Sequence, residues 1–378
     1  MRRIIFATIL IFALFGITLS QDNKPATKRH LPKTGIKYSN PFFAFKVIIP
    51  PGWMVGTPAT KNTHFSFYGP KVGSEQPRID LLVTKDKQPL TEFITTFKAA
   101  FKKAYPDIEF KTDGALTMTT PKAKETYQFT ATFTADGNAM KNIYTFLSND
   151  ERKYVLSFNA KETIFDSLST AVDTSMRSLR IMKEPSLTDD QRKEFSRHYN
   201  VGVSAAQNGK FDDALKEYLE AEKIFPDYDE LHMRLGMAYS LKGDLPNAQK
   251  EFERAALLDP DDYDYHFNLG TTLTKNNKYD EALKSLSRAA ELDPEQEQTY
   301  TNMGVIYLLK QNNPEKAIEV LTKAVKCDPE STLAHYNLGL AYEGTGKTKE
   351  AEREFKDTLK LDTAHKGAKD GLERIKKK

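Results

Sequence analysis

The 378-residue sequence predicts an α+β domain, an antiparallel sheet flanked by helices, followed by an all-α solenoid of five helical hairpins plus a C-terminal capping helix. Two observations lead to this prediction. Before residue 160, several runs alternate apolar and polar residues, which is the period of a half-buried strand. After residue 190, glycines, alanines and prolines recur at a fixed spacing of 34 residues.

The helical repeat is marked by three small or helix-ending residue types. Glycine recurs at Gly202, Gly236, Gly270, Gly304 and Gly339, alanine at Ala214, Ala248, Ala282, Ala317 and Ala351, and proline at Pro226, Pro260, Pro294 and Pro329. The step is 34 residues except for one of 35 in the fourth unit. Small residues let two helices cross closely, and proline ends a helix because it lacks an amide proton.

This pattern resembles the tetratricopeptide repeat in five consecutive units. The units are 195–228, 229–262, 263–296, 297–331 and 332–365, within an array that runs over 191–365. One hairpin is too small to bury its own apolar face, so the units are expected to stack into a right-handed solenoid with a concave inner surface. The inserted residue predicts a longer inter-helix turn at Lys310–Pro314, with Pro314 in the first turn of the next helix. Residues 366–378 carry Ala368, Leu372 and Ile375 on one helical face and lysines elsewhere, which is typical of a capping helix.

The first 20 residues predict a secretion signal peptide. Two arginines precede an uncharged apolar run over residues 4–19, and Ser20 suits a cleavage site. The run has 16 residues, fewer than the roughly 20 that span a bilayer, so cleavage near Gln21 is favoured over a retained anchor, although that alternative stays open. The mature protein would have no membrane span and would be periplasmic or secreted, as in a bacterial envelope. The polar segment 21–37 is expected to be a flexible tether.

Residues 38–183 form the predicted α+β domain. Pro50, Pro51 and Gly52 close its first strand and place Trp53 at a turn. Residues 136–138 form a hairpin turn. Strands are predicted at 43–49, 65–68, 79–84, 125–134, 141–148 and 153–159, and helices at 90–104 and 162–179.

The order of these elements resembles the PsbP family, in the DcrB-type form. The resemblance rests on the Phe-rich first strand that ends in PPGW, the strand YVLSFNA and the closing helix that ends in RSLRIM. It implies an α/β/α sandwich with an accessory, non-enzymatic role. Residues 184–190 are the expected linker, and Thr188 followed by Gln191 predicts a capping box that opens the repeats.

Catalytic motifs are absent from the sequence. It contains no G-x-S-x-G, no phosphate-binding loop, no H-E-x-x-H and no paired C-x-x-C, so neither an enzyme nor a cofactor is predicted. A net charge of +3 is too small to indicate a nucleic-acid partner. The single cysteine, Cys327, excludes an internal disulfide, and its repeat position predicts a buried small hydrophobe.

Four histidines occupy one repeat position, four residues before each glycine: His198, His232, His266 and His335. A shared metal would need their ring nitrogens within about 2 Å of one ion. Equivalent residues of successive repeats are instead at least one helix spacing, roughly 10 Å, apart. We therefore expect the histidines to pack between the helices of their hairpins, and no metal site is predicted.

The resemblance to the tetratricopeptide repeat implies a partner-binding groove along the first helices of the units. The matching positions are Tyr199, Asn200, Val203, Met233, Arg234, Met237, Phe267, Asn268, Thr271, Thr301, Asn302, Val305, Tyr336, Asn337 and Leu340. Aromatics, methionines and carboxamides suit an extended peptide. Phe267 and Tyr336 are predicted to point into the groove, and His266 and His335 away from it. Tyrosine and asparagine are also common scaffold residues of the repeat, so a purely structural role stays open.

The functional hypothesis is an exported, non-enzymatic adaptor that binds other proteins or extended peptides through the groove. An alternative is that the PsbP-like domain binds a small apolar or lipid ligand between its sheet and helices, with the repeats as a docking module. A third is an enzyme accessory or a degraded enzyme, which the missing catalytic motifs disfavour. The sequence predicts no particular oligomeric state.

Overall fold

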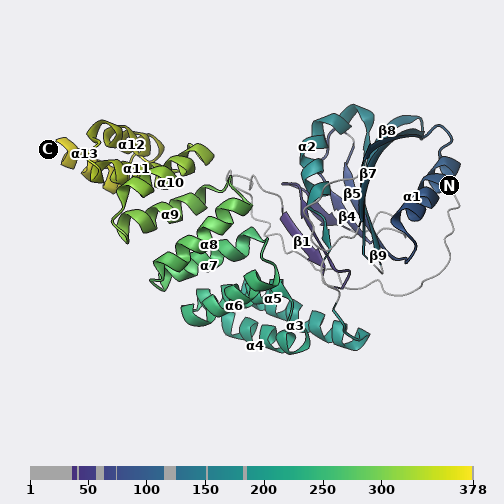
Figure 1. Cartoon of the computed structure of the whole chain (residues 1–378), viewed down its shortest axis with the longest axis horizontal. Helices are drawn as coiled ribbons and strands as arrows, with labels where there is room; N and C mark the ends of the chain where they lie inside the picture. Colours follow the sequence, from purple (N-terminus) through teal and green to yellow (C-terminus); the bar gives the residue numbers. More distant parts are fainter. Residues whose placement is uncertain are drawn as a thin grey trace. The chain divides into compact units, whose positions relative to one another are not determined.

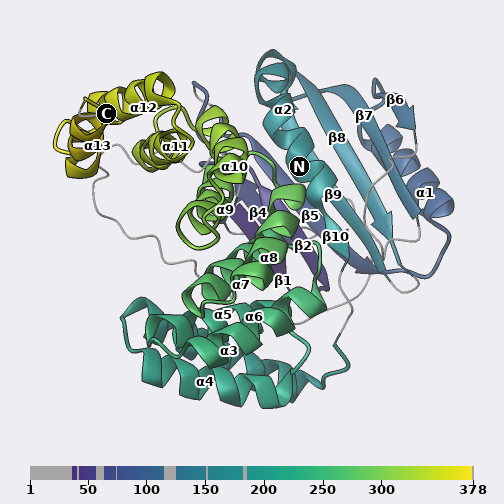
Figure 2. The ribbon, with the colours of Figure 1, turned by 60° about the vertical axis from the view of Figure 1, so that its left-hand side comes forward.

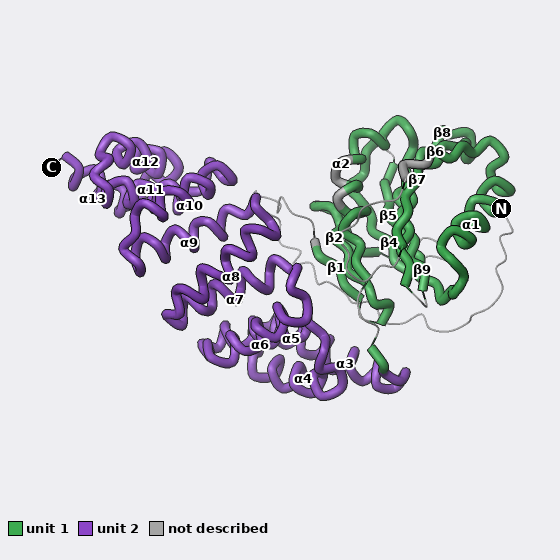
Figure 3. Tube along the Cα trace, in the orientation of Figure 1, with its two compact units in different colours: residues 1–186 green, residues 187–378 purple. Residues whose placement is uncertain are grey.

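The computed structural model describes residues 36–40, 42–56, 64–73, 75–114, 125–149, 152–181 and 185–376. The chain divides into two compact units, residues 1–186 and 187–378, which Figure 3 shows in different colours. An N-terminal sheet unit is followed by a run of helical hairpins. The predicted signal peptide and most of the predicted tether lie outside the described residues.

The N-terminal unit is built on antiparallel sheets (Figure 1). In spatial order, the seven-stranded sheet contains β3 (Met54–Gly56), β4 (Phe65–Tyr68), β5 (Arg78–Lys85), β9 (Arg152–Lys161), β8 (Asn138–Ser148), β7 (Glu125–Ala135) and β6 (Glu109–Gly114). A three-stranded sheet contains β1 (Ile36–Asn40), β2 (Phe45–Ile49) and β10 (Arg180–Ile181). The turn between β7 and β8 has positive φ at Asp136 and Gly137, as a tight two-residue hairpin requires.

Two helices cover opposite faces of the large sheet. Helix α1 (Leu90–Ala104) packs on the face that includes Val155, whereas α2 (Glu162–Ser178) and the small sheet pack on the face that includes Tyr154 and Leu156 (Figure 2). Neighbouring residues of β9 thus serve different cores because strand side chains alternate between faces. The predicted antiparallel sheet flanked by helices is confirmed, and the PsbP-like identity stays a prediction.

The structure differs from the sequence prediction at several edges of this unit. Strand β1 starts at Ile36, inside the segment expected to be a tether, and pairs with β2. The expected helical ending RSLRIM instead leaves the helix at Leu179, after which Arg180 and Ile181 pair with β2. Trp53 follows a turn as predicted, but its ring is only 3% exposed.

The C-terminal unit is a stack of hairpins followed by one more helix (Figure 1). Its helices are α3 (Asp189–Gln207), α4 (Phe211–Ile224), α5 (Asp229–Leu241), α6 (Leu245–Leu258), α7 (Tyr263–Lys275), α8 (Tyr279–Leu292), α9 (Glu297–Leu309), α10 (Pro314–Cys327), α11 (Thr332–Gly344), α12 (Thr348–Leu361) and α13 (Lys366–Lys376). The capping box that opens α3 is confirmed, because Thr188 and Gln191 each bind the other's backbone N–H. Among the described residues, none of the helices is long and apolar enough to cross a membrane.

The one-residue insertion lies in the turn between α9 and α10, as the repeat step predicts. This turn contains four residues, 310–313, whereas the turn after α3 contains three, 208–210. Pro314 is the first residue of α10, and the Asn313 side chain accepts a hydrogen bond from the Lys316 amide at 3.1 Å. Proline is tolerated there because the first amides of a helix have no intrahelical acceptor.

Close helix crossings explain the repeated glycine. A Cβ atom at Gly236 would lie 2.7 Å from the Phe252 ring of the second helix of the same hairpin. Each second helix also packs on the first helix of the next hairpin. Contacts between first helices join α3 to α5, α7 to α9 and α9 to α11, and side chains of α5 and α7 pack against one apolar cluster. The first helices therefore form one continuous surface of the solenoid.

Candidate functional site

Side chains of the predicted groove meet across successive first helices. Asn302 Nδ2 donates to Thr271 Oγ1 at 3.4 Å, which joins α9 to α7. Met233 of α5 and Phe267 of α7 pack against the same apolar cluster. We call Met233, Arg234, Met237, Phe267, Thr271 and Asn302 the groove surface.

Most of the groove surface is half-buried, which leaves part of each side chain accessible. Met237 is the most exposed of these residues, at 39%, and the other five are half-buried. The Arg234 guanidinium lies 2.8 Å from Glu230, whose negative charge raises the pKa of Arg234 and keeps it cationic. Asn200 and Asn268 are also half-buried, and Asn268 Nδ2 donates to the Asp264 carbonyl of its own helix at 2.8 Å.

Three predicted groove residues are instead part of the packed interior: Tyr199, Asn337 and Thr301, which is 2% exposed. Tyr199 is 7% exposed because Phe195 and Tyr228 pack on its ring. Asn337 is 4% exposed, and its Nδ2 donates to the Leu333 carbonyl. Tyr336 is half-buried, and its ring lies 4.5 Å from that of His365, the residue before the capping helix.

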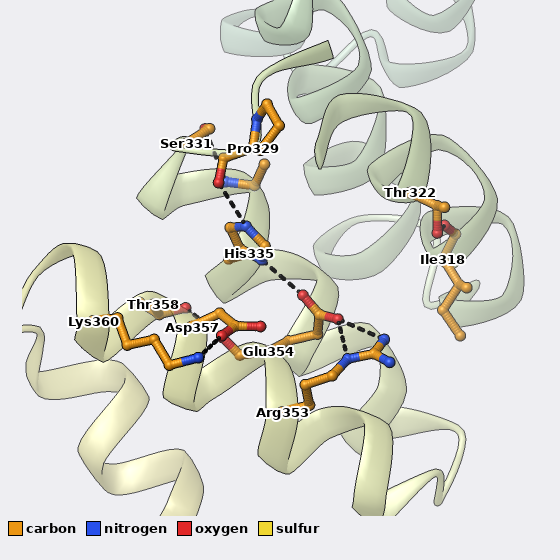
Figure 4. Close-up of polar contacts among 11 residues, drawn as sticks. Ile318, Thr322, Pro329, Ser331, His335, Arg353, Glu354, Asp357, Thr358 and Lys360 are labelled. Atoms are coloured by element: carbon orange, nitrogen blue, oxygen red, sulfur yellow. Dashed lines mark hydrogen bonds and ion pairs between the residues drawn. The ribbon is translucent and has the colours of Figure 1, made fainter. Parts of the chain in front are cut away.

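His198, His232 and His335 lie between the helices of their hairpins, as predicted, and they also make polar contacts that the sequence analysis missed. His335 is 7% exposed, and its Nδ1 lies 2.7 Å from Glu354 Oε2 on α12 (Figure 4). Its Nε2 lies 3.1 Å from the Pro329 carbonyl at the end of the preceding hairpin. The Arg353 guanidinium donates to the other Glu354 oxygen at 2.9 Å.

These contacts favour a charged pair. A carbonyl oxygen only accepts hydrogen bonds, so Nε2 of His335 carries a proton, and a second proton on Nδ1 lets it donate to Glu354. The hydrogen bond to Glu354 raises the pKa of His335. Burial pushes the pKa of Glu354 upward, but hydrogen bonds from His335 and Arg353 outweigh it and lower that pKa.

A histidine and a glutamate 19 residues later form this contact in three hairpins. His198 Nδ1 lies 2.7 Å from Glu217, and His232 Nδ1 lies 2.8 Å from Glu251. In the third hairpin, Ser285 stands where the others have glutamate. The constant 19-residue spacing is visible in the sequence once the repeats are aligned. It is the sequence feature that could have predicted these histidine–glutamate contacts.

Cys327 is half-buried rather than buried, contrary to the prediction. It is the last residue of α10, and its Sγ lies 3.5 Å from the Pro294 carbonyl. The end of a second helix has packing partners on fewer sides than its middle. This repeat position is therefore less enclosed than its apolar residues suggested.

Aromatic rings fill the space between α1 and the large sheet. The Phe97 ring lies 5.3 Å from that of Tyr144 and 5.2 Å from that of Phe146. Beside them, Lys98 Nζ lies 4.4 Å from the centroid of the Phe129 ring, which is a cation–π contact. The described residues of this interface thus give no support to the alternative of an apolar ligand between helix and sheet.

Comparison with known proteins identifies the repeats. Family models described as "Tetratricopeptide repeat" match residues 233–297 and 333–365, and one described as "TPR repeat" matches 205–243 and 308–346. No catalytic family is indicated. A comparison with curated proteins finds no match.

Solved structures with the same kind of helical stack cover about half of this chain. A MamA protein is 26% identical, with 46% of this chain and 93% of that chain covered and a TM-score of 0.44. MamA from Desulfovibrio magneticus RS-1 is 24% identical, with 48% and 99% covered and a TM-score of 0.44. YrrB, titled a TPR protein with an unusual peptide-binding site, is 21% identical, with 49% and 95% covered and a TM-score of 0.45. The family-model matches, together with the five hairpins, identify the helical unit as a run of tetratricopeptide repeats.

Proposed function

We propose that this protein is an exported, non-enzymatic adaptor that binds an extended segment of a partner protein on the groove surface. The observation that carries the proposal is the accessible apolar strip of Met233, Met237 and Phe267 on successive first helices. The wider helical unit is a tetratricopeptide array, a fold that implies protein or peptide partners. The apolar run over residues 4–19 supports export.

The chemistry of the groove surface suits an extended peptide. Methionine is unbranched and adapts its shape to different apolar partners. Arg234 borders this strip, but its guanidinium is already paired with Glu230 at 2.8 Å, so it gives no preference for an acidic partner segment. Asn302 and Thr271 add hydrogen-bonding groups for a peptide backbone.

The test is a single charge placed at Met237. Met237→Asp should weaken capture of protein partners from envelope extract at least tenfold, because a buried apolar contact at the centre of an interface is replaced by a desolvated carboxylate. Leu257→Asp is the matched control, since Leu257 is 70% exposed on the second helix α6. Both variants should melt within a few degrees of the wild type.

The outcomes separate the alternatives. Equal capture by both variants would show that the groove surface is not the binding site. Loss of capture by Leu257→Asp alone would move the site to the surface of the second helices. Failure of the wild type to bind any protein or peptide would refute the adaptor role.

A further inference from the structure

His232 presents a ring nitrogen to two carboxylates. Its Nε2 lies 2.8 Å from the Pro226 carbonyl, and because a carbonyl only accepts, Nε2 carries a proton. The other nitrogen, Nδ1, lies 2.8 Å from Glu251 Oε2 and 3.9 Å from Glu222 Oε1. A lone pair on Nδ1 would repel these oxygens, so a positive charge, either a proton or a metal cation, belongs between them.

The spacing of these three atoms suits a small cation. Ligands bound tetrahedrally at about 2.0–2.1 Å from one ion lie about 3.3 Å from each other. The two nitrogen–oxygen distances, 2.8 and 3.9 Å, bracket that value, and all three ligand atoms lie within 4.8 Å of one another. A histidine that donates its second N–H to a backbone carbonyl is also the usual orientation of a metal-bound imidazole.

The burial and the charge of these three side chains also suit a bound cation. His232 is 3% and Glu251 is 6% exposed, so their charges are poorly solvated. The Glu222 side chain is 32% exposed, which leaves a path for an ion and a place for a water ligand. Lys250 approaches Glu251 at 3.9 Å, but its side chain is 79% exposed, so two carboxylates retain much of their negative charge.

The two related histidines differ in charge from this cluster. His335 also has two carboxylates nearby, Glu354 and Asp357, with the three ligand atoms within 4.8 Å, but Lys360 Nζ pairs with Asp357 at 2.6 Å. At His335, the Arg353 guanidinium already binds Glu354 at 2.9 Å and neutralises it. At His198, Nε2 faces the Arg197 guanidinium at 2.7 Å, and arginine can only donate. Nδ1 of His198 therefore carries the proton that it donates to Glu217, and it has no lone pair for a metal.

We propose that Glu222, His232 and Glu251 bind one divalent transition-metal ion of the Zn²⁺ type. One imidazole and two carboxylates suit Zn²⁺ better than Mg²⁺ or Ca²⁺, which prefer all-oxygen sites. The ion would join α4 of the first repeat to α5 and α6 of the second. The site uses a single histidine, so the wide separation of histidines in successive repeats does not exclude it.

The experiment uses the untagged, metal-free full chain with Zn²⁺ alone as the probe. The wild type should bind one equivalent of Zn²⁺ with higher affinity than any further equivalents that bind at the surface. Its melting temperature should rise with Zn²⁺ but not with Mg²⁺. Glu222→Gln should weaken this binding at least tenfold and abolish the rise, while its metal-free melting stays near that of the wild type because Glu222 is partly exposed. His335→Gln is the control, and its Zn²⁺ response should match that of the wild type.

A second readout reports on the ligands directly. Co²⁺ bound by nitrogen and oxygen in a tetrahedral site should give a visible absorption band in the wild type that is lost in both Glu222→Gln and His232→Gln. If His232→Gln does not fold, Glu222→Gln decides alone. The proposal is overturned if the wild type shows no Zn²⁺-dependent rise, or if Glu222→Gln binds as tightly as the wild type.

Discussion

Single glycines set how closely the two helices of each hairpin approach. The Phe252 ring that faces Gly236 is 1% exposed and has no room to move away from an added methyl group. We expect Gly236→Ala to lower the free energy of unfolding by about 1–3 kcal/mol, because overpacking exceeds the gain in helix propensity. Urea denaturation measures this loss.

Gly344→Ala is the matched control for that substitution. It ends α11, and a Cβ atom there would lie 3.4 Å from the nearest side-chain atom, of Pro314. Stability should stay the same or rise by up to about 1 kcal/mol, since alanine is the better helix former. Equal losses in both variants would mean that the crossing distance is not what the glycine serves.

At the same scale, the sequence predicted positions better than it predicted contacts. The glycines were evident because a fixed period marks them. The glutamates paired with His232 and His335 also recur at a constant spacing of 19 residues, but spacing alone does not show that two side chains meet, because that depends on how the two helices pack. The contact of Tyr336 with α13 was missed for the same reason, since this helix packs on it only after the stack has formed.

At the scale of elements, the buried pair of His335 and Glu354 ties α11 to α12 and to the preceding hairpin. The raised pKa of His335 gives stability that is complete below about pH 6.5 and is lost as pH rises through that raised pKa. The lowered pKa of Glu354 gives stability that is present above about pH 4.5 and is lost as pH falls through the lowered pKa. The pair therefore contributes most between these values.

His335→Gln tests this pH dependence. It should lower the free energy of unfolding by about 1–3 kcal/mol at pH 6, and the difference from the wild type should shrink toward pH 9. Urea denaturation across this pH range measures it. His266→Gln is the control, because Ser285 replaces the glutamate there and no ion pair is lost. A difference that stays constant from pH 6 to pH 9 would show that His335 contributes only packing.

Long elements were predictable, whereas only some of the short ones were. Helix α1 begins and ends where its apolar period predicts, and β7, β8 and β9 lie within a few residues of the predicted strands. The short β4 matches the strand predicted at 65–68, but β3, β6 and β10 were not predicted, because so few positions show no clear alternation there. They form because their backbone groups hydrogen-bond to the edge of a neighbouring strand, and this pairing depends on the tertiary structure.

At the scale of the whole chain, the two units have separate hydrophobic cores, so each should unfold independently of the other. The sequence indicated both units by a change from period-two alternation to a 34-residue repeat. Two spectroscopic signals distinguish the unfolding of the two units: tryptophan fluorescence and far-ultraviolet circular dichroism. Trp53, the chain's only tryptophan, is buried in the sheet unit, whereas most helical residues belong to the repeats.

Removal of the capping helix should therefore lower the unfolding midpoint seen by circular dichroism and leave the midpoint seen by tryptophan fluorescence unchanged. Helix α13 buries Ala368 and Ile375 against Phe355, and a Cβ atom at Gly371 would lie 2.6 Å from that ring. Without residues 366–378, Phe355 and Tyr336 become exposed, at a cost of about 1.5–3 kcal/mol for each large apolar side chain that loses its cover. Because each repeat is stabilised by its neighbours, the loss should lower the melting temperature seen by far-ultraviolet circular dichroism.

Tryptophan fluorescence should keep its midpoint in the same deletion variant. Arg374→Ala is the matched control, since it removes only the exposed ion pair with Glu343 and should cost less than about 1 kcal/mol. If both signals shift together on deletion, the two units unfold cooperatively and do not depend on separate cores. If neither shifts, α13 contributes no stability, and the stack does not need its contacts with Phe355 and Tyr336.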